Sequence, residues 1–562
     1  MRHWRVLLFW YCLSSPLWCQ VKIICPLPNA IVQKISDSMF VRFISVSTSS
    51  TKIGLKITDS VGSNIPSLSL LEFSFHNNTL DTFFTFPQLS KFTIVWHILD
   101  GEIDSGKIDN LCVGHVFGIA GQSNAQGWSP PPFVTPQGNI RMLRNDSAWE
   151  AGEDPTGGMY ASPWIQFANR LQGLLNDSLP IGIVNAAIGG TGLVTKTSAG
   201  WWQRNEALHD DIASVYGNAL RKFLAAGAKF EALFWIQGES DCVGVTKNDY
   251  STAFRQLINN FEEDLGVPIQ VFHFQIGGQI GNPDKIDWGI IREAQRNLPL
   301  STLVGTAVGN VIGWDGIHYS ANTEIMVGDR FAGAIAKEIY SIPNNFYPPI
   351  LPNNSAALEP CSFPYKGFKI VFGTTRASLP TELKVVDTLR GFQIRVNSLL
   401  LDTSRIFAKV ESSNKSIIDI FLRDSSLMPN DDLQLSYALT GDVSNVNVTD
   451  NDSSTSVPNY LPAFIDIPVL VQSGVSESIT LLPNIPNPFS EESSFHLVLN
   501  ENAFVSYSVY SIDGRLVLTN VLGMMEGGSH LIQLERGSLV SGTYEIVFRI
   551  GSEIKTFKFI II

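Results

Sequence analysis

Between residues 111 and 342, the sequence alternates short apolar runs with amphipathic segments. The apolar runs have the length of strands, and they lie at 116–120, 181–187, 232–236 and 270–276. Strands that are apolar along their whole length are typical of parallel sheets covered by helices. The pattern therefore predicts an α/β domain over residues 111–342, with a parallel sheet and helices on both of its faces.

The sequence on either side of this domain predicts β-structure. The chain has 562 residues, enough for about three to five domains. Residues 20–110 and 365–470 contain short alternating runs separated by Ser, Asn, Gly and Asp, which favour all-β, sandwich-like domains. Residues 343–364 are rich in Pro and Asn and predict a linker, and residues 478–562 predict a final β-unit.

The N-terminus and the charge balance indicate where the protein works. Residues 1–19 have the pattern of a secretory signal peptide, with Arg2 and Arg5 before the apolar run 6–13. No other run approaches the roughly 18 apolar residues of a membrane span, so no stable membrane insertion is expected. The net charge of −13 argues against nucleic-acid binding. We therefore expect an exported protein without a nucleic-acid partner.

The cysteines leave two interpretations open. Four remain after residues 1–19: Cys25, Cys112, Cys242 and Cys361. In an exported protein they could form two disulfides, and they could equally be buried thiols. No CxxC pair is present, so the sequence shows no zinc-type spacing. We expect no metal and no cofactor.

Four short motifs follow apolar runs of the α/β domain. They are GQSN with Ser123, the glycine turn with Gly190, WIQGESD with Gln237, and WDGIHYS with Asp315 and His318. The carboxyl ends of parallel strands meet at one edge of a sheet, so the four motifs should lie together. Each motif alone is typical of a turn or a helix cap. For Glu239 and Asp241 of WIQGESD, loop ordering is the favoured interpretation.

Together the motifs supply the parts of an acyl-transfer site. A serine after a strand can be a nucleophile. A carboxylate three residues before a histidine can accept one imidazole N–H and leave the other nitrogen as a base. The sequence therefore predicts Ser123, Asp315 and His318 as catalytic residues.

The order GQSN, GGT, QGESD and DGIHYS resembles the SGNH/GDSL-type hydrolases, and most closely their sialate O-acetylesterase and acetylxylan esterase branch. Segments 291–296 (IREAQR) and 460–466 (YLPAFID) also resemble that branch. The resemblance implies a flavodoxin-like sheet and a secreted serine esterase acting on an acetylated carbohydrate, such as sialic acid or plant polysaccharide.

The resemblance also implies an oxyanion hole. Its donors would be the backbone N–H groups of Ser123 and Gly190 and the side-chain amide of Gln237. Ala125 and Ile236 stand where Met and His are common in that branch, and they leave the proposed catalytic groups intact. Two alternatives remain: a non-catalytic glycan-binding protein on this fold, and a lipase-type esterase. Trp201 and Trp202, near the motifs, suit sugar stacking, lipid contact or the core.

The C-terminal unit resembles a second family. Residues 483–489, 508–517 and 539–548 are similar to the type IX secretion sorting domain of Bacteroidetes. The resemblance implies export through the periplasm by the type IX secretion machinery, to the medium or the cell surface. The alternative is a carbohydrate-binding sandwich.

Overall fold

The computed structural model describes most of the chain beyond residue 20. The described residues are 21–35, 38–48, 52–60, 62–63, 65, 70–87, 91–100, 104–144, 148–176, 179–205, 213–281, 285–309, 315–347, 349, 351–361, 367–375, 382–412, 414–422, 431–443, 445–449, 461–471, 479–499, 502–511, 515–551 and 553–562. The predicted signal peptide, 1–19, lies outside them.

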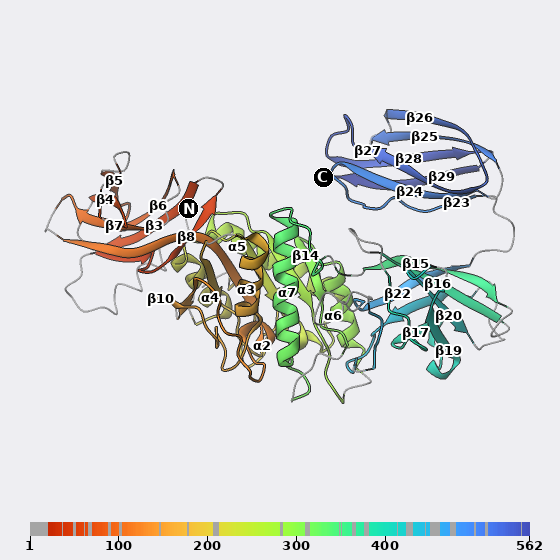
Figure 1. The fold of residues 1–562 in the computed structure, drawn as a ribbon, viewed down its shortest axis with the longest axis horizontal. Helices are drawn as coiled ribbons and strands as arrows, with labels where there is room; N and C mark the ends of the chain where they lie inside the picture. Colours follow the sequence, from red (N-terminus) through yellow and green to blue (C-terminus); the bar gives the residue numbers. More distant parts are fainter. Residues whose placement is uncertain are drawn as a thin grey trace. The chain divides into compact units, whose positions relative to one another are not determined.

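The N-terminal β-region leads directly into the α/β domain (Figure 1). It contains β1 (Val21–Cys25), β2 (Ile31–Ile35), β3 (Ser38–Ser47), β4 (Lys52–Asp59), β5 (Leu71–Ser74), β6 (Thr79–Pro87), β7 (Lys91–Ile98) and β8 (Ser105–Gly121). Strand β3 pairs antiparallel with β1, β2 and β6, and β7 pairs antiparallel with β4 and β8. The first part of β8 pairs with β7, and its last part lies inside the sheet of the α/β domain. One strand therefore belongs to both regions.

The sheet of the α/β domain has the order β10-β9-β11-β8-β12-β13-β14. Its remaining strands are β9 (Ile140–Arg144), β10 (Ala148–Ala151), β11 (Ile181–Asn185), β12 (Ala232–Ile236), β13 (Val271–Gln275) and β14 (Ser301–Thr306). All neighbours pair in parallel except β10, which is antiparallel to β9. Strand β8 lies between β11 and β12, so the strand that precedes Ser123 is flanked on both sides.

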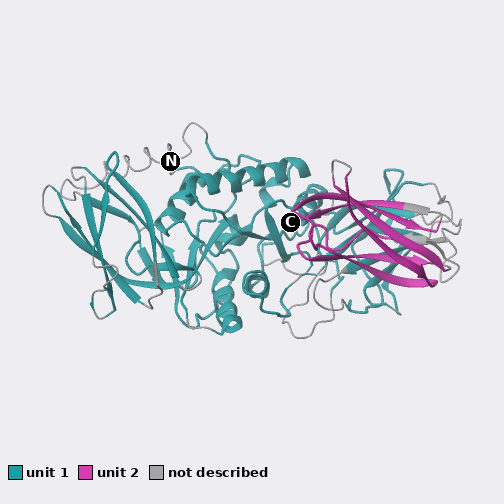
Figure 2. Ribbon diagram, turned by 90° about the horizontal axis from the view of Figure 1, so that it is seen from above, with its two compact units in different colours: residues 1–470 teal, residues 471–562 magenta. Residues whose placement is uncertain are grey.

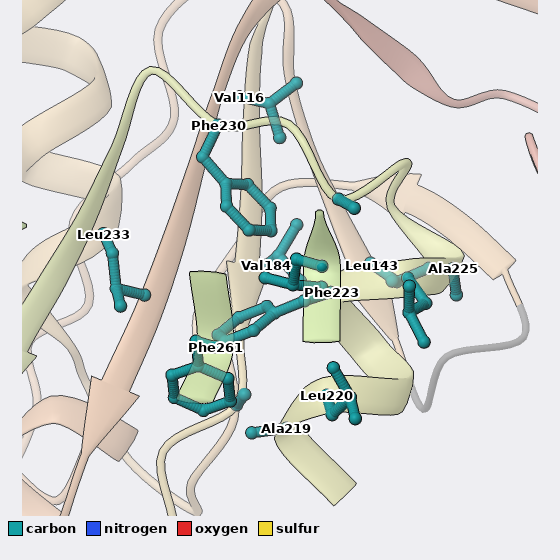
Figure 3. Packing of buried hydrophobic residues seen from close by; sticks show 14 of the residues in the cluster. Val116, Leu143, Val184, Ala219, Leu220, Phe223, Ala225, Phe230, Leu233 and Phe261 are labelled. Atoms are coloured by element: carbon teal, nitrogen blue, oxygen red, sulfur yellow. The ribbon is translucent and has the colours of Figure 1, made fainter. Parts of the chain in front are cut away.

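Helices cover both faces of this sheet. They are α2 (Ser123–Gln126), α3 (Pro163–Leu175), α4 (Val215–Ala225), α5 (Lys247–Leu265), α6 (Asp287–Arg296) and α7 (Ala321–Glu338). Helices α3, α4, α5 and α7 begin after a Ser or Thr whose side chain accepts a backbone N–H of the first turn. Helices α3 and α7 share one buried apolar cluster, while α4, α5 and α6 share another; Figure 3 shows part of the latter, around Phe223 and Phe261. The structure thus has the layers that the sequence predicts here.

The second β-region follows the α/β domain. Its sheet has the order β18-β17-β21-β22-β15-β16-β20-β19. The strands are β15 (Leu351–Cys361), β16 (Gly367–Thr375), β17 (Phe392–Val396), β18 (Leu399–Leu400), β19 (Ile406–Val410), β20 (Ile417–Leu422), β21 (Leu433–Tyr437) and β22 (Phe464–Val471). The predicted linker, 343–364, is therefore wrong for residues 351–361, which pair with β16 despite their Pro and Asn residues.

The last part of the chain is a separate compact unit. Residues 471–562 are distinct from residues 1–470, as Figure 2 shows by colour. The unit contains β23 (Ile479–Leu481), β24 (Glu492–Leu499), β25 (Ala503–Ser511), β26 (Leu516–Met525), β27 (Gly528–Glu535), β28 (Gly542–Ile550) and β29 (Glu553–Ile561). Its strands enclose an apolar cluster of their own, around Phe495, Val509 and Phe548.

Three of the four cysteines are free and buried: Cys25, Cys112 and Cys242. The thiol interpretation therefore holds for them. The side chain of Cys361 is not among those described. Every helix in the described residues is too short or too polar to cross a membrane.

Candidate active site

Ser123 stands at the turn between β8 and α2. Strand β8 ends at Gly121, whose φ is +131°, and a Cβ there would lie 2.1 Å from the carbonyl oxygen of Ile236. Only glycine lets the two strand ends approach so closely. Gln122 N donates to Ile236 O at 2.9 Å, and Ser123 is 8% exposed. The ends of β8 and β12 therefore fix the serine in place.

The side chain of Gln122 strengthens this junction. Its Oε1 accepts hydrogen bonds from Gln237 Nε2 at 3.2 Å, Gly238 N at 3.3 Å and Ser240 N at 3.2 Å. These donors all come from the loop that follows β12. The residue before the serine thus binds the neighbouring loop to the serine's own turn.

Gln237 differs from its expected role. Its side chain is fully buried, and its Nε2 contacts Asp241 Oδ2 at 2.8 Å, Thr191 O at 3.2 Å and Gln122 Oε1. Tyr250 donates to its Oε1 at 3.0 Å. An amide nitrogen has two hydrogens, and acceptors within the protein engage both. This geometry does not support the predicted donation from Gln237 to an oxyanion; the side chain instead joins three loops.

The glycine turn lies beside the serine. Gly190 has a φ of +73°, and a Cβ on Gly189 would lie 3.5 Å from the Cβ of Ser123. Gln126 Oε1 accepts from Gly189 N at 2.8 Å and so ties this turn to α2. Among the described residues, the backbone N–H groups of Ser123 and Gly190 have no protein acceptor. They are therefore available to a ligand.

Asp241 orders the loop beyond the glycine turn. Its carboxylate accepts from the backbone N–H groups of Leu193 at 2.6 Å, Val194 at 3.1 Å and Thr195 at 2.7 Å. The loop-ordering interpretation is confirmed for this residue. In the same loop Trp202 is fully buried and donates to Thr191 Oγ1, while Trp201 is 37% exposed. Only Trp201 of the pair presents a surface to solvent.

Asp315 and His318 form the predicted pair. His318 Nδ1 donates to Asp315 Oδ2, and the backbone N–H groups of Ile317 and His318 donate to Asp315 Oδ1 at 3.1 and 2.9 Å. Partial burial acts to raise the pKa of Asp315, but the hydrogen bonds from His318 and Ile317 outweigh it, so this pKa lies below its ordinary value. The carboxylate is ionised at neutral pH and leaves Nε2 of the imidazole as the basic nitrogen.

Trp128 covers the imidazole. Its ring stacks on that of His318, with centroids 5.5 Å apart and an interplanar angle of 21°. Trp128 Nε1 donates to Gln126 Oε1 at 2.9 Å, the same oxygen that holds Gly189. Gln126 and Trp128 therefore connect His318 to the glycine turn and to α2.

Asn124 joins the serine turn to the histidine loop. Its Oδ1 accepts from Tyr319 N at 3.1 Å, and its Nδ2 donates to Glu239 Oε1 at 2.7 Å. Burial raises the pKa of Glu239, and the hydrogen bond from Asn124 offsets only part of that rise. Asn124 is itself buried, so it links the two loops inside the protein.

The structure thus brings the predicted residues to one edge of the sheet. Within the described residues, Ser123 Oγ and His318 have no direct hydrogen bond; such contacts often tighten only when substrate binds. The same residues hold no group of three or more His, Cys, Asp or Glu that could bind a metal ion.

Sequence reasoning missed four side chains: Gln122, Asn124, Gln126 and Trp128. All lie in or next to the GQSN motif, and the available signal was that a buried turn needs polar partners for its backbone groups.

The comparison with known families agrees with this site. Residues 113–337 match the family model "Carbohydrate esterase, sialic acid-specific acetylesterase". This range contains Ser123, Gly190, Gln237, Asp315 and His318. No curated protein matches the chain.

Solved structures extend the comparison to the fold. A carbohydrate acetylesterase from Xanthomonas citri is 15% identical, with a TM-score of 0.58, and the match covers 79% of this chain and 99% of that one. NanS is 16% identical over 40% of this chain and 98% of its own, but its TM-score of 0.31 is too low to carry an argument. At 15% identity, the similarity to the Xanthomonas citri structure shows a shared fold.

Proposed function

We propose that this chain is a serine esterase that removes O-acetyl groups from carbohydrates. The observation that carries the proposal is that Ser123 and the Asp315–His318 pair lie at the same edge of the sheet. The family match over residues 113–337 supports a carbohydrate ester as the substrate.

Ser123 attacks the acetyl carbonyl carbon in the first step. Its proton passes from Oγ to His318 Nε2, while Asp315 holds the opposite side of the ring and stabilises the imidazolium. Collapse of the tetrahedral intermediate breaks the bond to the sugar oxygen, which takes the proton from His318. Ser123 is left acetylated. Water then attacks the acetyl carbon while His318 Nε2 takes its proton. As the bond to Ser123 Oγ breaks, His318 returns the proton to Oγ, which releases acetate and restores the serine.

The backbone N–H groups of Ser123 and Gly190 are the proposed donors to the oxyanion. Both lack a protein acceptor within the described residues. Each donor of this kind contributes roughly 3–4 kcal/mol to transition-state stabilisation. Gln237 supports them indirectly, because its amide joins the loops that carry both groups.

The test is acetate release from acetylated sialosides and acetylated xylans, compared with p-nitrophenyl acetate and a long-chain p-nitrophenyl ester. We expect release from acetylated sugars and little hydrolysis of the long-chain ester. Glycan binding without hydrolysis would favour the binding-protein alternative. A preference for the long-chain ester would favour the lipase alternative.

We also propose that residues 1–19 direct export and that residues 478–562 act as a type IX sorting domain, with the catalytic part released from the cell or held at its surface. The separate core of the C-terminal unit supports a part that can be removed. A chain ending at Leu470 should keep its kcat/KM and accumulate in the periplasm. Normal release of this shortened chain would contradict the sorting role.

A further inference from the structure

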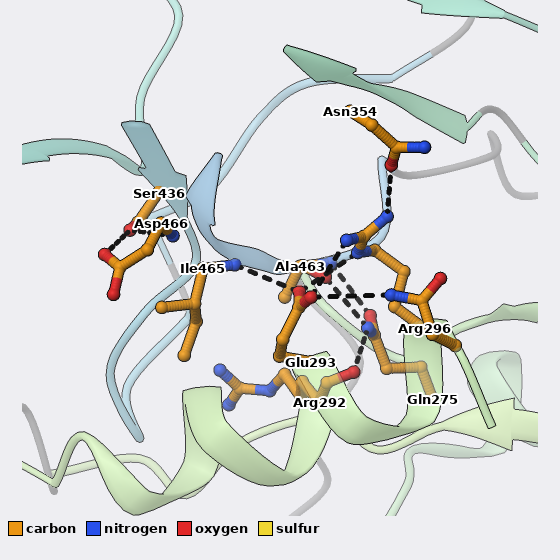
Figure 4. Close-up of polar contacts among 10 residues, drawn as sticks. Gln275, Arg292, Glu293, Arg296, Asn354, Ser436, Ala463, Ile465 and Asp466 are labelled. Atoms are coloured by element: carbon orange, nitrogen blue, oxygen red, sulfur yellow. Dashed lines mark hydrogen bonds and ion pairs between the residues drawn. The ribbon is translucent and has the colours of Figure 1, made fainter. Parts of the chain in front are cut away.

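Helix α6 and the second β-region meet through polar contacts, which bring segment 291–296 together with residues 461–466. At the end of β13, Gln275 donates to Ala463 O at 3.0 Å and accepts from Ala463 N at 2.9 Å. On α6, Glu293 accepts from Ile465 N at 3.1 Å, as Figure 4 shows. Side chains of the α/β domain thus complete the backbone hydrogen bonding of the second β-region.

Arg292 is a fully buried charged residue at this contact. Its side chain is 0% exposed; Nε donates to Gly277 O at 2.7 Å, and Nη1 donates to Ala438 O at 2.6 Å and Thr440 O at 2.9 Å. Burial lowers the pKa of Arg292 to about 10, so the guanidinium stays charged at neutral pH. These acceptors are carbonyls of two segments, and losing the guanidinium would leave them buried without that donor.

The two segments held by Arg292 lie against each other. A Cβ on Gly278 would be 2.2 Å from Gly441 O, and Gln279 N donates to the same oxygen at 2.8 Å. Gly281 N donates to Asp442 Oδ2 at 3.3 Å. Residues 277–281 of the α/β domain, here called the strap, therefore rest on residues 438–442 of the second β-region.

The strap continues to the catalytic pair. Ile280 N donates to Gly316 O at 2.9 Å, and Gly316 directly follows Asp315. A Cβ on Gly316 would lie 3.6 Å from the Cβ of Ile280, which is ordinary contact. A chain of hydrogen bonds therefore runs from the second β-region, through the strap, to the loop that carries Asp315 and His318.

We propose that the second β-region positions the Asp315–His318 loop through the strap, with Arg292 as the buried positioning residue. The expected loss of kcat rests on the proposed esterase function, whereas the expected loosening of the Asp315–His318 loop does not. A strap that loses its support lets the imidazole drift from Ser123, and a misplacement of about 1 Å can cost roughly 100-fold in rate.

The experiment uses the full chain with Arg292→Met and the matched control Arg296→Gln. Arg296 contacts the same β-region through Asn354 Oδ1 at 3.1 Å and pairs with Glu293 at 2.8 Å, and within the described residues neither contact involves the strap. We expect Arg292→Met to lower kcat on p-nitrophenyl acetate by roughly 10–100-fold with KM nearly unchanged. The kcat of Arg296→Gln should stay within about twofold of the wild-type value, because the lost contacts do not reach the strap. Equal losses in the two variants would overturn the proposal.

A third variant, Ile280→Gly, avoids the buried interface, because the Ile280 side chain is mostly exposed. It should lower kcat by roughly fivefold or more without changing the unfolding temperature. If Arg292→Met does not fold, Ile280→Gly alone tests whether the strap positions the Asp315–His318 loop. Unchanged kcat in Ile280→Gly would contradict the role of the strap.

Hydrogen exchange of the peptide that covers residues 315–320 separates this inference from the proposed function. Exchange should be faster in Arg292→Met and in Ile280→Gly, and unchanged in Arg296→Gln. That result supports positioning even if the wild type shows no esterase activity, which would contradict only the proposed function. Unchanged exchange in the first two variants, with an active wild type, would overturn the inference alone.

Discussion

The two halves of the candidate site are supported in different ways. Ser123 follows a strand that is paired on both sides, and its turn is buried between the ends of β8 and β12. Asp315 and His318 lie in a loop whose side chains remain 21% and 17% exposed. Asn124, Trp128 and Ile280, all distant in sequence, contact that loop.

This difference shows that the two parts of the site depend on different kinds of contact. The sheet places Ser123, because backbone hydrogen bonds on both sides of β8 leave its end little freedom. The Asp315–His318 loop depends on single contacts, and one substitution can remove the side-chain contact of Asn124 or of Trp128. We therefore expect substitutions on the serine side to abolish the reaction or to lower global stability. Substitutions around the histidine loop should each lower kcat by a smaller, separate amount.

The largest effect should come from the nucleophile itself. Ser123→Ala should reduce kcat to below about a thousandth of the wild-type value, since little catalysis survives without a triad member. The unfolding temperature should stay the same, because backbone hydrogen bonds hold the turn, from Gln122 N to Ile236 O and from Gly127 N to Ser123 O, and alanine keeps them. Steady-state kinetics and thermal unfolding measure both. Retained turnover would place the nucleophile elsewhere.

The next effect concerns the carboxylate of the histidine loop. Asp315→Asn keeps an oxygen for the N–H groups of Ile317 and His318 but turns an amide toward Nδ1. The imidazole then takes the wrong tautomer, and kcat should fall by up to about 10⁴-fold with KM little changed. Asp402→Asn is the matched control, since Asp402 also accepts a backbone N–H two residues on, at Ser404, far from the site in sequence. Equal activity in Asp315→Asn and the wild type would show that the pair is structural.

A smaller effect should follow when the two halves are disconnected. Asn124→Ala removes the bridge between Tyr319 N and Glu239 and should lower kcat by roughly tenfold, with a loss of about 1–2 kcal/mol of stability. The control is Asn169→Ala, which removes a similar bridge between Gln137 N and Thr135 O. A kcat loss as large in the control would mean that Asn124 has no special link to the site.

The smallest effect concerns Asp154, whose Oδ1 accepts from Ser162 N at 3.2 Å and from Ser162 Oγ at 2.7 Å, just before α3. Burial raises the pKa of Asp154 from 3.8 to about 6, although hydrogen bonds from Ser162 oppose the shift. The folded state therefore binds the proton more tightly than the unfolded state. This contribution to stability is fully present below about pH 4 and is lost as the pH rises through about 6.

Asp154→Asn should remove that dependence. Between about pH 4 and pH 7 the wild type should lose about 1–3 kcal/mol more than the variant, as measured by denaturant unfolding. Activity at neutral pH should hardly change. Parallel stability profiles for the two proteins would contradict the shifted pKa.

Much of the fold could be predicted from the sequence. Strands such as Ala232–Ile236 are apolar throughout, and glycines with a serine or an amide after them mark where such strands end. Local patterns of this kind suffice to bring four motifs to one edge. The segment Leu351–Cys361 was missed because its Pro and Asn residues favour a loop, while pairing with β16 overrides that preference.

The site could be predicted less fully. The pairing of Asp315 and His318 follows from a spacing of three residues, but the engagement of Gln237 by Asp241, Thr191 and Gln122 depends on how three loops converge. The strap on the second β-region likewise depends on contacts between residues more than a hundred positions apart. Spacing along the chain carries no signal for such contacts.

Covalent labelling with a fluorophosphonate, located by peptide mass spectrometry, tests most directly the proposal that Ser123, at the end of β8, is the nucleophile of an esterase. We expect one modified peptide, which contains Ser123, and a loss of acetate release in proportion to labelling. Labelling should be slow in Asp315→Asn and absent in Ser123→Ala. Labelling of another residue, or full acetate release from a protein labelled at Ser123, would contradict it.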